Sequence, residues 1–360
     1  MDTFPRFKAA VVQAAPVWLD REATCEKACG LIAAAADEGA QLVAFPEAWL
    51  PGFPWWIFLG TPAWGNSFFA ELFANSVEIP SSTTERLCRA AKEAELYVVM
   101  GLDERSGGSL YCTQLFIDRE GRILGRHRKL KPTHVERSVW GQGDGSDLRV
   151  FDTPLGKIGG LNCWEHMQPL TRYAMYSFGE QIHVASWPAF SLYRKYAYAL
   201  GEVANVGATR QYALEGSCFA LMAVSLVSKE MVDRLADTAE RADLIEVGGG
   251  ASQIFAPDGS TIGGPPRPDE EAIVTAEIDL YEIARAKNFA DPAGHYARPD
   301  IFRLVLNRNP QPCVQEDALW EFTDATADTV RAPGGEDEGG ADREPPWDRG
   351  PMGREPGESA

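Results

Sequence analysis

The stretch GGLNCWEH, residues 159–166, holds the feature around which the rest of the chain is organised. An apolar run from Lys157 to Leu161 leads into a single thiol, Cys163, and a helix-like segment follows over 168–178. A cysteine between a strand and a helix lies where main-chain N–H groups converge, which favours a thiolate or a developing anion. A lone cysteine is also typical of a buried core, where it behaves as a small hydrophobe. Other residues of the chain must therefore decide between a nucleophile and a structural thiol.

Short apolar runs and helical segments alternate on both sides of this stretch. Strands are expected at 7–14, 41–45, 96–102, 181–186, 217–224 and 273–278, and helices at 20–38, 84–94, 196–215 and 280–287. Paired runs around turn sequences predict hairpins of 110–117 with 122–129, 148–151 with 157–161, and 252–255 with 261–263. This order predicts an α/β protein with two halves whose sheets pack face to face.

Composition and charge exclude several classes of protein. The chain has 360 residues, of which 45% are hydrophobic, so it can bury a substantial core. Its formal charge of −18 argues against nucleic acid and anionic membrane surfaces as partners. The first residues lack the features of a signal peptide, and no apolar run approaches the ~20 residues of a membrane span. Seven cysteines without Cys-x-x-Cys spacing form neither a disulfide framework nor a zinc site. We therefore expect a cytoplasmic protein.

The C-terminal part differs in composition from the rest. From about Ala332 the chain is rich in glycine, proline and acidic residues, with too little apolar surface to offset the entropy of ordering. The expected division is a catalytic domain over 1–310, a C-terminal extension over 311–331 and a disordered acidic tail over 332–360.

Three charged or nucleophilic residues follow apolar or β-patterned segments. Glu47 follows 41–45, Lys129 ends the run 122–129, and Cys163 follows 157–161. Each alone has an ordinary explanation, because loop acids and basic runs such as RHRKLK (126–131) are usually solvated. An ionisable residue at the end of a buried strand is costly unless it is paired or functional. Their joint occurrence at strand ends suggests a shared site at one rim of a sheet.

A thiol, a carboxylate and an ammonium together define a specific chemistry. The carboxylate takes a proton from sulfur and later from water. The ammonium stabilises the negative charge that develops on the substrate. This chemistry requires no metal and no cofactor, and no His, Cys and carboxylate cluster has metal-ligand spacing. A papain-like Cys–His pair is the alternative, with candidates at His134, His166, His183 and His295, but the sequence around Cys163 does not fit that pattern.

Three stretches resemble the motif blocks of the nitrilase branch of the carbon–nitrogen hydrolase superfamily. They are FPEAW (45–49), RKLKPTHVER (128–137) and LNCWEHMQPL (161–170). Further agreement lies in VWGQGDG (139–145), GGGASQIF (248–255) and GHYARP (294–299), so the resemblance covers residues 5–310 in order. Three blocks together are far more specific than any one of them.

The resemblance implies a four-layer αββα sandwich and a set of roles. Glu47 would be the general base, Lys129 the stabilising cation and Cys163 the nucleophile. Glu136 matches the family's second glutamate, which orients the lysine and the substrate; a surface glutamate paired with Arg137 is the alternative. The reaction would convert a nitrile and water into a carboxylic acid and ammonia through a covalent thioimidate. The resemblance also implies self-association into dimers that stack into spirals.

Aromatic residues suggest the walls of a substrate pocket. Phe53, Trp140, Trp164 and Trp187 are the candidates. The small residues Ala189 and Ala251 leave room for aryl or arylalkyl nitriles. Hydrolysis or hydration of cyanide and hydrolysis of aliphatic amides by the same site stay open as alternatives. A catalytically silent assembly scaffold is the non-enzymatic alternative, which the intact set of Glu47, Lys129 and Cys163 disfavours.

Overall fold

A computed structural model describes residues 4–312, which contain two six-stranded sheets. The order of the first sheet is β12 (Ala272–Asp279), β1 (Arg6–Gln13), β2 (Ala40–Ala44), β3 (Tyr97–Ser106), β4 (Ser109–Ile117) and β5 (Ile123–Arg128). The order of the second is β11 (Thr261–Gly263), β10 (Gln253–Phe255), β9 (Phe219–Val224), β8 (Ile182–Trp187), β7 (Gly156–Asn162) and β6 (Val150–Thr153). Within these sheets β1, β2 and β3 are parallel, as are β7, β8 and β9. The three predicted hairpins are confirmed as the antiparallel pairs β4–β5, β6–β7 and β10–β11.

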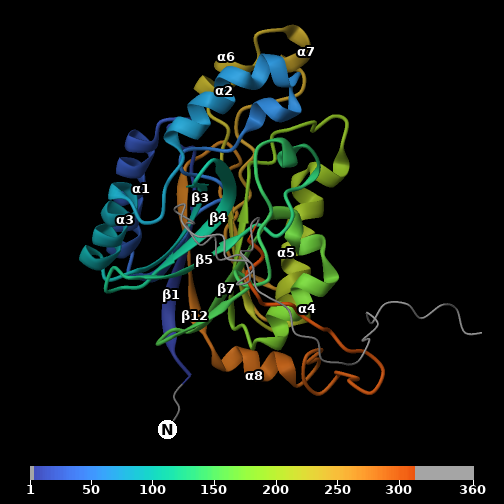
Figure 1. The fold of residues 1–360 in the computed structure, drawn as a ribbon. Helices are drawn as coiled ribbons and strands as arrows, with labels where there is room; N and C mark the ends of the chain where they lie inside the picture. The colour runs from blue at the N-terminus through green and yellow to red at the C-terminus, as the bar shows by residue number, and fades with distance from the viewer. Residues whose placement is uncertain (1–3, 313–360) are drawn as a thin grey trace, which may run out of the picture. The chain divides into compact units, whose positions relative to one another are not determined.

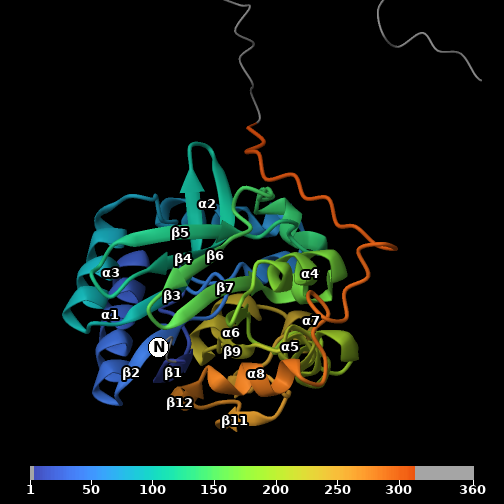
Figure 2. The same ribbon diagram turned by 90° about the horizontal axis from the view of Figure 1, so that it is seen from below.

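Helices cover the outer face of each sheet. Helices α1 (Arg21–Asp37) and α3 (Ser82–Glu93) lie on one side, and α4 (Pro169–Ser177) and α5 (Glu202–Gly216) lie on the other. Figure 2 shows the same arrangement from a perpendicular direction, with both sheets between the two helix layers. Helix α8 (Tyr281–Lys287) follows β12. The predicted four-layer αββα sandwich is therefore confirmed.

Alternating side chains in the strands explain why the layers form. In β1, Val11 belongs to the cluster between the sheets, whereas Val12 packs in the cluster that includes α1 and α3 residues. In β9, Leu221 faces the other sheet and Met222 the opposite side. Every strand of this kind buries both of its faces, and each buried aliphatic side chain contributes about 1.5–3 kcal/mol. Continuous apolar runs such as 7–14 are the sequence signature of this double burial.

The two sheets also meet through polar groups near the ends of β7 and β8. The Gln114 amide donates hydrogen bonds to the Leu161 and Val184 carbonyls and to the Ser186 hydroxyl. Gly160 allows this contact, because a Cβ there would lie 2.5 Å from Gln114 Oε1. Gly101 in β3 likewise admits the backbone that follows β2, because a Cβ would lie 1.8 Å from the Pro46 oxygen. Small residues thus let the two strand ends approach each other.

Some elements differ from the sequence-based prediction. The helix expected at 196–215 begins only at Glu202, because residues 198–200 form a separate 3-10 turn (η4, Tyr198–Leu200) and Gly201 is the N-cap of α5. Helix α2 (Pro62–Asn75) was not predicted, although Thr61 caps its N-terminus and Pro62 occupies its first turn. The short helices α6 (Lys229–Leu235) and α7 (Ala239–Ala242) were not predicted either. All three additions surround the aromatic loop that follows Glu47 or the segment after β9.

The predictions for the C-terminus extend beyond the residues that the structure describes. The predicted extension from 311 and the acidic tail from 332 lie, from residue 313 onward, outside the described residues. Across residues 4–312, no helix combines the length and the apolar character needed to cross a membrane.

Candidate active site

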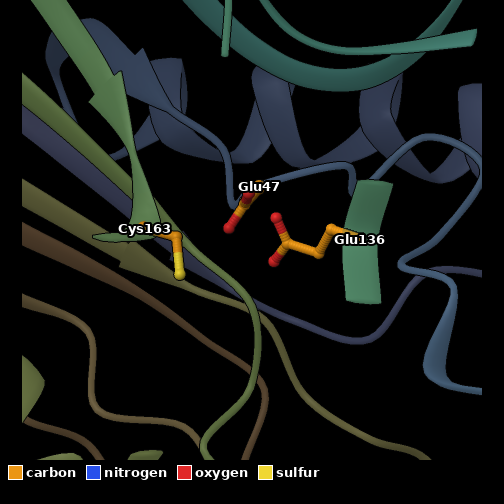
Figure 3. Close-up of side chains that lie close together, drawn as sticks. All are labelled: Glu47, Glu136 and Cys163. Carbon is orange, nitrogen blue, oxygen red and sulfur yellow. The ribbon is translucent and has the colours of Figure 1, made fainter. Parts of the chain in front are cut away.

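The ends of three strands bring Glu47, Lys129 and Cys163 together. Glu47 follows β2, Lys129 follows β5, and Cys163 follows β7. The nearest polar atoms of Glu47, Glu136 and Cys163 all lie within 4.8 Å of one another, and Figure 3 shows these side chains converging on a common space. The main-chain N–H of Glu47 donates to the Trp187 carbonyl at the end of β8, which ties the two sheets together at this point. Because all of these groups are buried, their interactions are poorly screened by solvent.

Lys129 is the fully buried centre of the cluster. Its ammonium donates to Glu47 Oε1 and to Glu136 Oε2, each at 2.7 Å. Burial alone would lower the pKa of Lys129, but the charges of Glu136 and Glu47 outweigh this effect and raise it well above its usual value. An ammonium has three N–H donors, so one remains for a third partner. Lys129 therefore carries a permanent positive charge beside the thiol.

Glu47 has one bound and one free carboxylate oxygen. Oε1 accepts from Lys129 and, at 3.3 Å, from the thiol of Cys112. Oε2 is buried and has no hydrogen-bond partner among the described residues. Burial raises the pKa of Glu47 to about 7, against the opposing effect of Lys129. A carboxylate with this pKa and a free oxygen suits a general base that exchanges protons near neutral pH.

Cys163 begins a short 3-10 helix (η3, Cys163–Met167) with a backbone φ of 48°. A positive φ is unfavourable for a residue with a side chain and is tolerated when the surrounding structure fixes it. Burial raises the pKa of Cys163 well above its usual value, and Glu47 raises it further, whereas Lys129 lowers it. Sulfur is therefore a thiol in the free protein and needs a base when it attacks.

Glu136 lies in a 3-10 helix (η2, His134–Ser138) and takes part in the buried cluster. Its Oε2 accepts from Lys129 and from the main-chain N–H of Thr133, each at 2.7 Å. The alternative of a surface pair with Arg137 is not found, because the Arg137 guanidinium donates to the His134 carbonyl instead.

Glu165 links the end of β5, which precedes Lys129, to the end of β7, which precedes Cys163. This role of Glu165 was not predicted from the sequence. Its carboxylate accepts from the main-chain N–H groups of Leu130 and Asn162, which are the neighbours of Lys129 and Cys163. It also pairs with His127 at 2.9 Å. Burial would raise the pKa of Glu165, but His127 and the two N–H donors together lower it. A permanently ionised carboxylate therefore fixes the spacing of the lysine and the nucleophile.

Cys112 is the second residue that sequence reasoning missed. It lies in β4 and is fully buried, and burial raises its pKa well above the usual value, so it remains a thiol. Its only sequence signal is its place in an alternating strand, which it shares with many structural residues.

The two buried histidine candidates, His166 and His183, do not form a Cys–His pair with the sulfur atom of Cys163. His166 Nδ1 lies 2.6 Å from the main-chain oxygen of Cys163, and its Nε2 faces His183. Neither ring nitrogen is thus directed to the sulfur atom.

A metal ion would compete with Lys129 for the same carboxylates. Glu47, Glu136 and Cys163 have the donor types and spacing of a metal site. The Lys129 ammonium already contacts both carboxylates and supplies the positive charge that an ion would bring. The residues therefore fit a metal ion poorly.

The cluster lies at the floor of a cavity of about 550 Å³, where Cys163 and Glu136 line the cavity and the fully buried Glu47 and Lys129 do not. Its walls come mainly from residues 53–58 and 187–200, and they include four of the predicted or small positions: Phe53, Trp164, Trp187 and Ala189. The amide of Asn205 also lines the cavity, but it is occupied by Trp164 Nε1 and by the Ala199 and Gly201 carbonyls. The walls are therefore mainly apolar, and the polar residues Thr133 and His134 also line the cavity.

Two predicted pocket positions lie elsewhere. Trp140 is not among the lining residues; its ring packs edge-on against Phe53 at 5.4 Å and its indole N–H donates to Asp103. Ala251 is buried in the cluster that packs around Cys163 and Trp187, away from the lining. Both residues lie behind the cavity wall. The sequence suggests that they are buried, but it does not show whether they line the cavity or pack behind the lining.

Comparisons with known proteins identify relatives of this chain. Residues 8–288 match the sequence profile of the carbon-nitrogen hydrolase family. A nitrilase of Pseudomonas syringae is 49% identical over 85% of this chain and 91% of its own length. An aliphatic nitrilase of Rhodococcus rhodochrous is 49% identical over 84% and 83%, and an arylacetone-specific nitrilase of Alcaligenes faecalis is 44% identical over 92% and 95%. The crystal structure of a carbon-nitrogen hydrolase from Helicobacter pylori superposes with a TM-score of 0.65 at 19% identity, covering 82% of this chain and 97% of that one.

The fold and the family match define the class of the protein: the chain belongs to the carbon–nitrogen hydrolase family. Its identity to several nitrilases over most of both chains places it, within that family, in the nitrilase branch. The predicted membership of the nitrilase branch is thereby confirmed.

Proposed function

We propose that this enzyme hydrolyses organic nitriles to carboxylic acids and ammonia through a covalent intermediate on Cys163. The observation that supports this most strongly is the buried group of one thiol, one ammonium and two carboxylates at the floor of an apolar cavity. No step of the reaction requires a cofactor.

In the first half of the reaction the thiol adds to the nitrile. Glu47 takes the proton of Cys163 as sulfur attacks the nitrile carbon. The remaining N–H of Lys129 donates to the nitrile nitrogen, on which negative charge develops. Glu136 holds Lys129 in place, and proton transfer to nitrogen completes a thioimidate on Cys163.

In the second half two water molecules release the product. Glu47 takes a proton from the first water as it adds to the thioimidate carbon, and collapse of the tetrahedral intermediate expels ammonia. The thioester that remains is attacked by a second water in the same way. The carboxylic acid leaves and Cys163 regains its proton, so one nitrile and two waters give one acid and one ammonia.

The cavity favours an apolar substrate larger than cyanide. A space of about 550 Å³ with aromatic walls suits a flat, weakly hydrogen-bonding group. The small side chain of Ala189 leaves room beside Trp187 for an aryl or arylalkyl chain. The relatives include both an aliphatic and an arylacetone-specific nitrilase and do not decide between these substrate classes. The proposed preference for aryl or arylalkyl nitriles therefore rests on the cavity walls of this chain.

A substrate panel tests the proposal. We expect the highest kcat/KM for phenylacetonitrile, with phenylacetic acid as the main product and ammonia in equal amount. A shorter aliphatic nitrile, cyanide and phenylacetamide should react more slowly, because they fill the walls poorly or need polar partners. Faster turnover of the amide or of cyanide would replace the nitrilase proposal with the corresponding alternative.

Three further expectations belong to the same proposal. The enzyme is expected to self-associate into dimers and larger spirals, to act in the cytoplasm, and to use residues 1–310 as its catalytic domain. Removal of residues 332–360 should leave turnover intact, and size-exclusion chromatography of both forms tests the association at the same time.

A further inference from the structure

Four buried polar side chains form a continuous row that ends on the main chain of Cys163. His166 Nδ1 lies 2.6 Å from the Cys163 carbonyl oxygen, and His166 Nε2 lies 2.9 Å from His183 Nε2. His183 Nδ1 lies 2.8 Å from Glu180 Oε1, and the Tyr212 hydroxyl donates to Glu180 Oε2 at 2.5 Å. We call these four side chains the histidine row. None of them lines the cavity, and none has a part in the reaction proposed above.

The row connects the nucleophile with the outer helix α5. His166 belongs to η3, His183 to β8 and Tyr212 to α5, while Glu180 lies between α4 and β8. All four are buried, so a polar atom left unpaired here would keep the full penalty of its lost hydration. Four mutually satisfied groups at this depth need a reason beyond packing, since apolar residues could fill the same space.

The acceptor at the Cys163 end of the row determines where the protons lie. A carbonyl oxygen only accepts, so His166 Nδ1 carries a hydrogen. A neutral His166 then has no hydrogen on Nε2, and His183 must donate to it. His183 Nδ1 is thus an acceptor, and Glu180 donates to it as a protonated carboxyl group.

The environment agrees with this neutral arrangement. Burial raises the pKa of Glu180 to about 8 and lowers the pKa of His166 to about 3. Burial also lowers the pKa of His183 well below its usual value. The row is therefore uncharged at neutral pH and is ordered in one direction, from Tyr212 to Glu180, then His183, then His166 and finally Cys163.

His166 also supports the cavity wall. Its ring stacks on Trp187, with centroids 5.1 Å apart and planes inclined by 23°. Trp187 lines the cavity and donates its indole N–H to Thr209 on α5. One imidazole thus contacts the backbone of the nucleophile and the back of the substrate wall.

We propose that the histidine row positions Cys163, holding its carbonyl so that the residue keeps its positive φ and its sulfur stays aimed at Glu47 and Lys129. His166 is the positioning residue in contact with Cys163, and His183, Glu180 and Tyr212 orient His166. The effect on turnover rests on the proposed function, but the effect on the thiol itself does not. A displacement of the nucleophile by about 1 Å can cost a hundredfold in rate.

Replacement of His166 tests the contact with Cys163. Asparagine can place an N–H donor close to the position of His166 Nδ1, whereas leucine cannot. We expect His166→Leu to lower kcat about a hundredfold with a much smaller change in KM, and His166→Asn to recover at least about tenfold of that loss. The rate of Cys163 alkylation by iodoacetamide, followed by peptide mass spectrometry on folded protein, should fall and recover in parallel. Equal kcat and alkylation rates in wild type and folded His166→Leu would overturn the proposal.

If His166→Leu does not fold, two matched pairs of variants at other positions test the same proposal. Glutamine can donate to His183 and accept from Tyr212, so Glu180→Gln should retain kcat within about threefold, while Glu180→Leu should lose at least about tenfold. Tyr212→Phe should lower kcat and alkylation about threefold. Tyr176→Phe is its control, because Tyr176 is buried beside Tyr212 but its hydroxyl donates to Glu215. Equal effects within each pair, or losses that follow only the melting temperature, would show a purely structural role.

Iodoacetamide also separates the two proposals. If the alkylation rate of Cys163 responds as expected while no nitrile is hydrolysed, the positioning role stands and the proposed reaction fails. If nitriles are hydrolysed but the row can be altered without effect on either readout, the positioning role fails alone.

Discussion

The floor and the walls of the cavity are built in opposite ways. The floor consists of charged or ionisable groups, three of them just after strands and Glu136 in η2, and the Lys129 ammonium donates to both carboxylates. The walls consist mainly of aromatic and aliphatic side chains from residues 53–58 and 187–200. Regular strands fix the floor through main-chain and side-chain hydrogen bonds, whereas the walls depend on packing. The difference suggests that the floor determines the reaction and the walls determine which nitrile reacts.

Among changes to the floor and the walls, removal of the nucleophile should lower turnover the most. We expect Cys163→Ala to lower kcat by at least about 10⁴-fold, because the covalent route disappears while the cavity remains. The measurement is ammonia release from phenylacetonitrile, with circular dichroism as the check on folding. Cys218→Ala is the control, since Cys218 is also buried but lies in a different cluster, and it should retain turnover. Near-normal turnover by Cys163→Ala would assign the chemistry to another group.

Weakening the charge network of the floor should have the next largest effect. Glu136→Gln leaves Lys129 with a single carboxylate partner and reduces its hold on the developing charge. We expect kcat to fall about 10²–10³-fold with less change in KM, measured by steady-state kinetics. Arg137→Gln, at the exposed neighbouring position, serves as the control and should stay near wild type. A change confined to KM would mean that Glu136 belongs with the walls.

The pH dependence of kcat/KM reports on the floor, because the floor holds the ionisable base Glu47. Glu47 acts as a base only when it is deprotonated, so kcat/KM should rise with pH through about 7. The Cys112 hydrogen bond lowers the pKa of Glu47, after the larger effects of burial and of Lys129. Cys112→Ala should therefore move the acid limb to higher pH, and Cys112→Ser, which keeps a donor, should move it much less. An acid limb that is the same in wild type and Cys112→Ala would exclude this role of Cys112.

Changes to the walls should have the smallest effect on chemistry and the clearest effect on selectivity. Ala189→Leu narrows the cavity beside Trp187 without touching the floor. We expect kcat/KM for phenylacetonitrile to fall about 10–200-fold, with a much smaller change for a short aliphatic nitrile. Competition between the two nitriles in one reaction measures the ratio directly. A uniform loss for both substrates would show that the wall also controls the geometry of the floor.

The sequence predicted the floor better than the walls, for a physical reason. Glu47, Lys129 and Cys163 follow apolar runs, and a run that is buried on both faces marks a strand whose end is known to within a few residues. Trp140 and Ala251 were expected at the cavity but lie behind it, because an aromatic or small residue in a loop has no periodicity to give its direction. The type of such a residue indicates that it is buried, but it does not indicate which neighbouring residues it contacts.

The contacts behind the floor were also beyond the reach of sequence reasoning. Glu165 is two residues from Cys163, yet its bonds to the main chains of residues 130 and 162 depend on how β5 and β7 end in space. Helix α2 had a local signal in Thr61 and Pro62, but its many aromatic residues obscured the polar face of an ordinary surface helix. Local sequence patterns therefore predict the strands, whereas the contacts between strand ends depend on tertiary packing.

Direct detection of the covalent intermediate tests the central claim most sharply. The enzyme is mixed with phenylacetonitrile, quenched in acid during turnover, and digested for peptide mass spectrometry. We predict that a phenylacetyl or phenylacetimidoyl group is found on the peptide that contains Cys163 and disappears when the substrate is exhausted. Turnover with an unmodified Cys163, or with the adduct on Cys112 instead, would contradict the account.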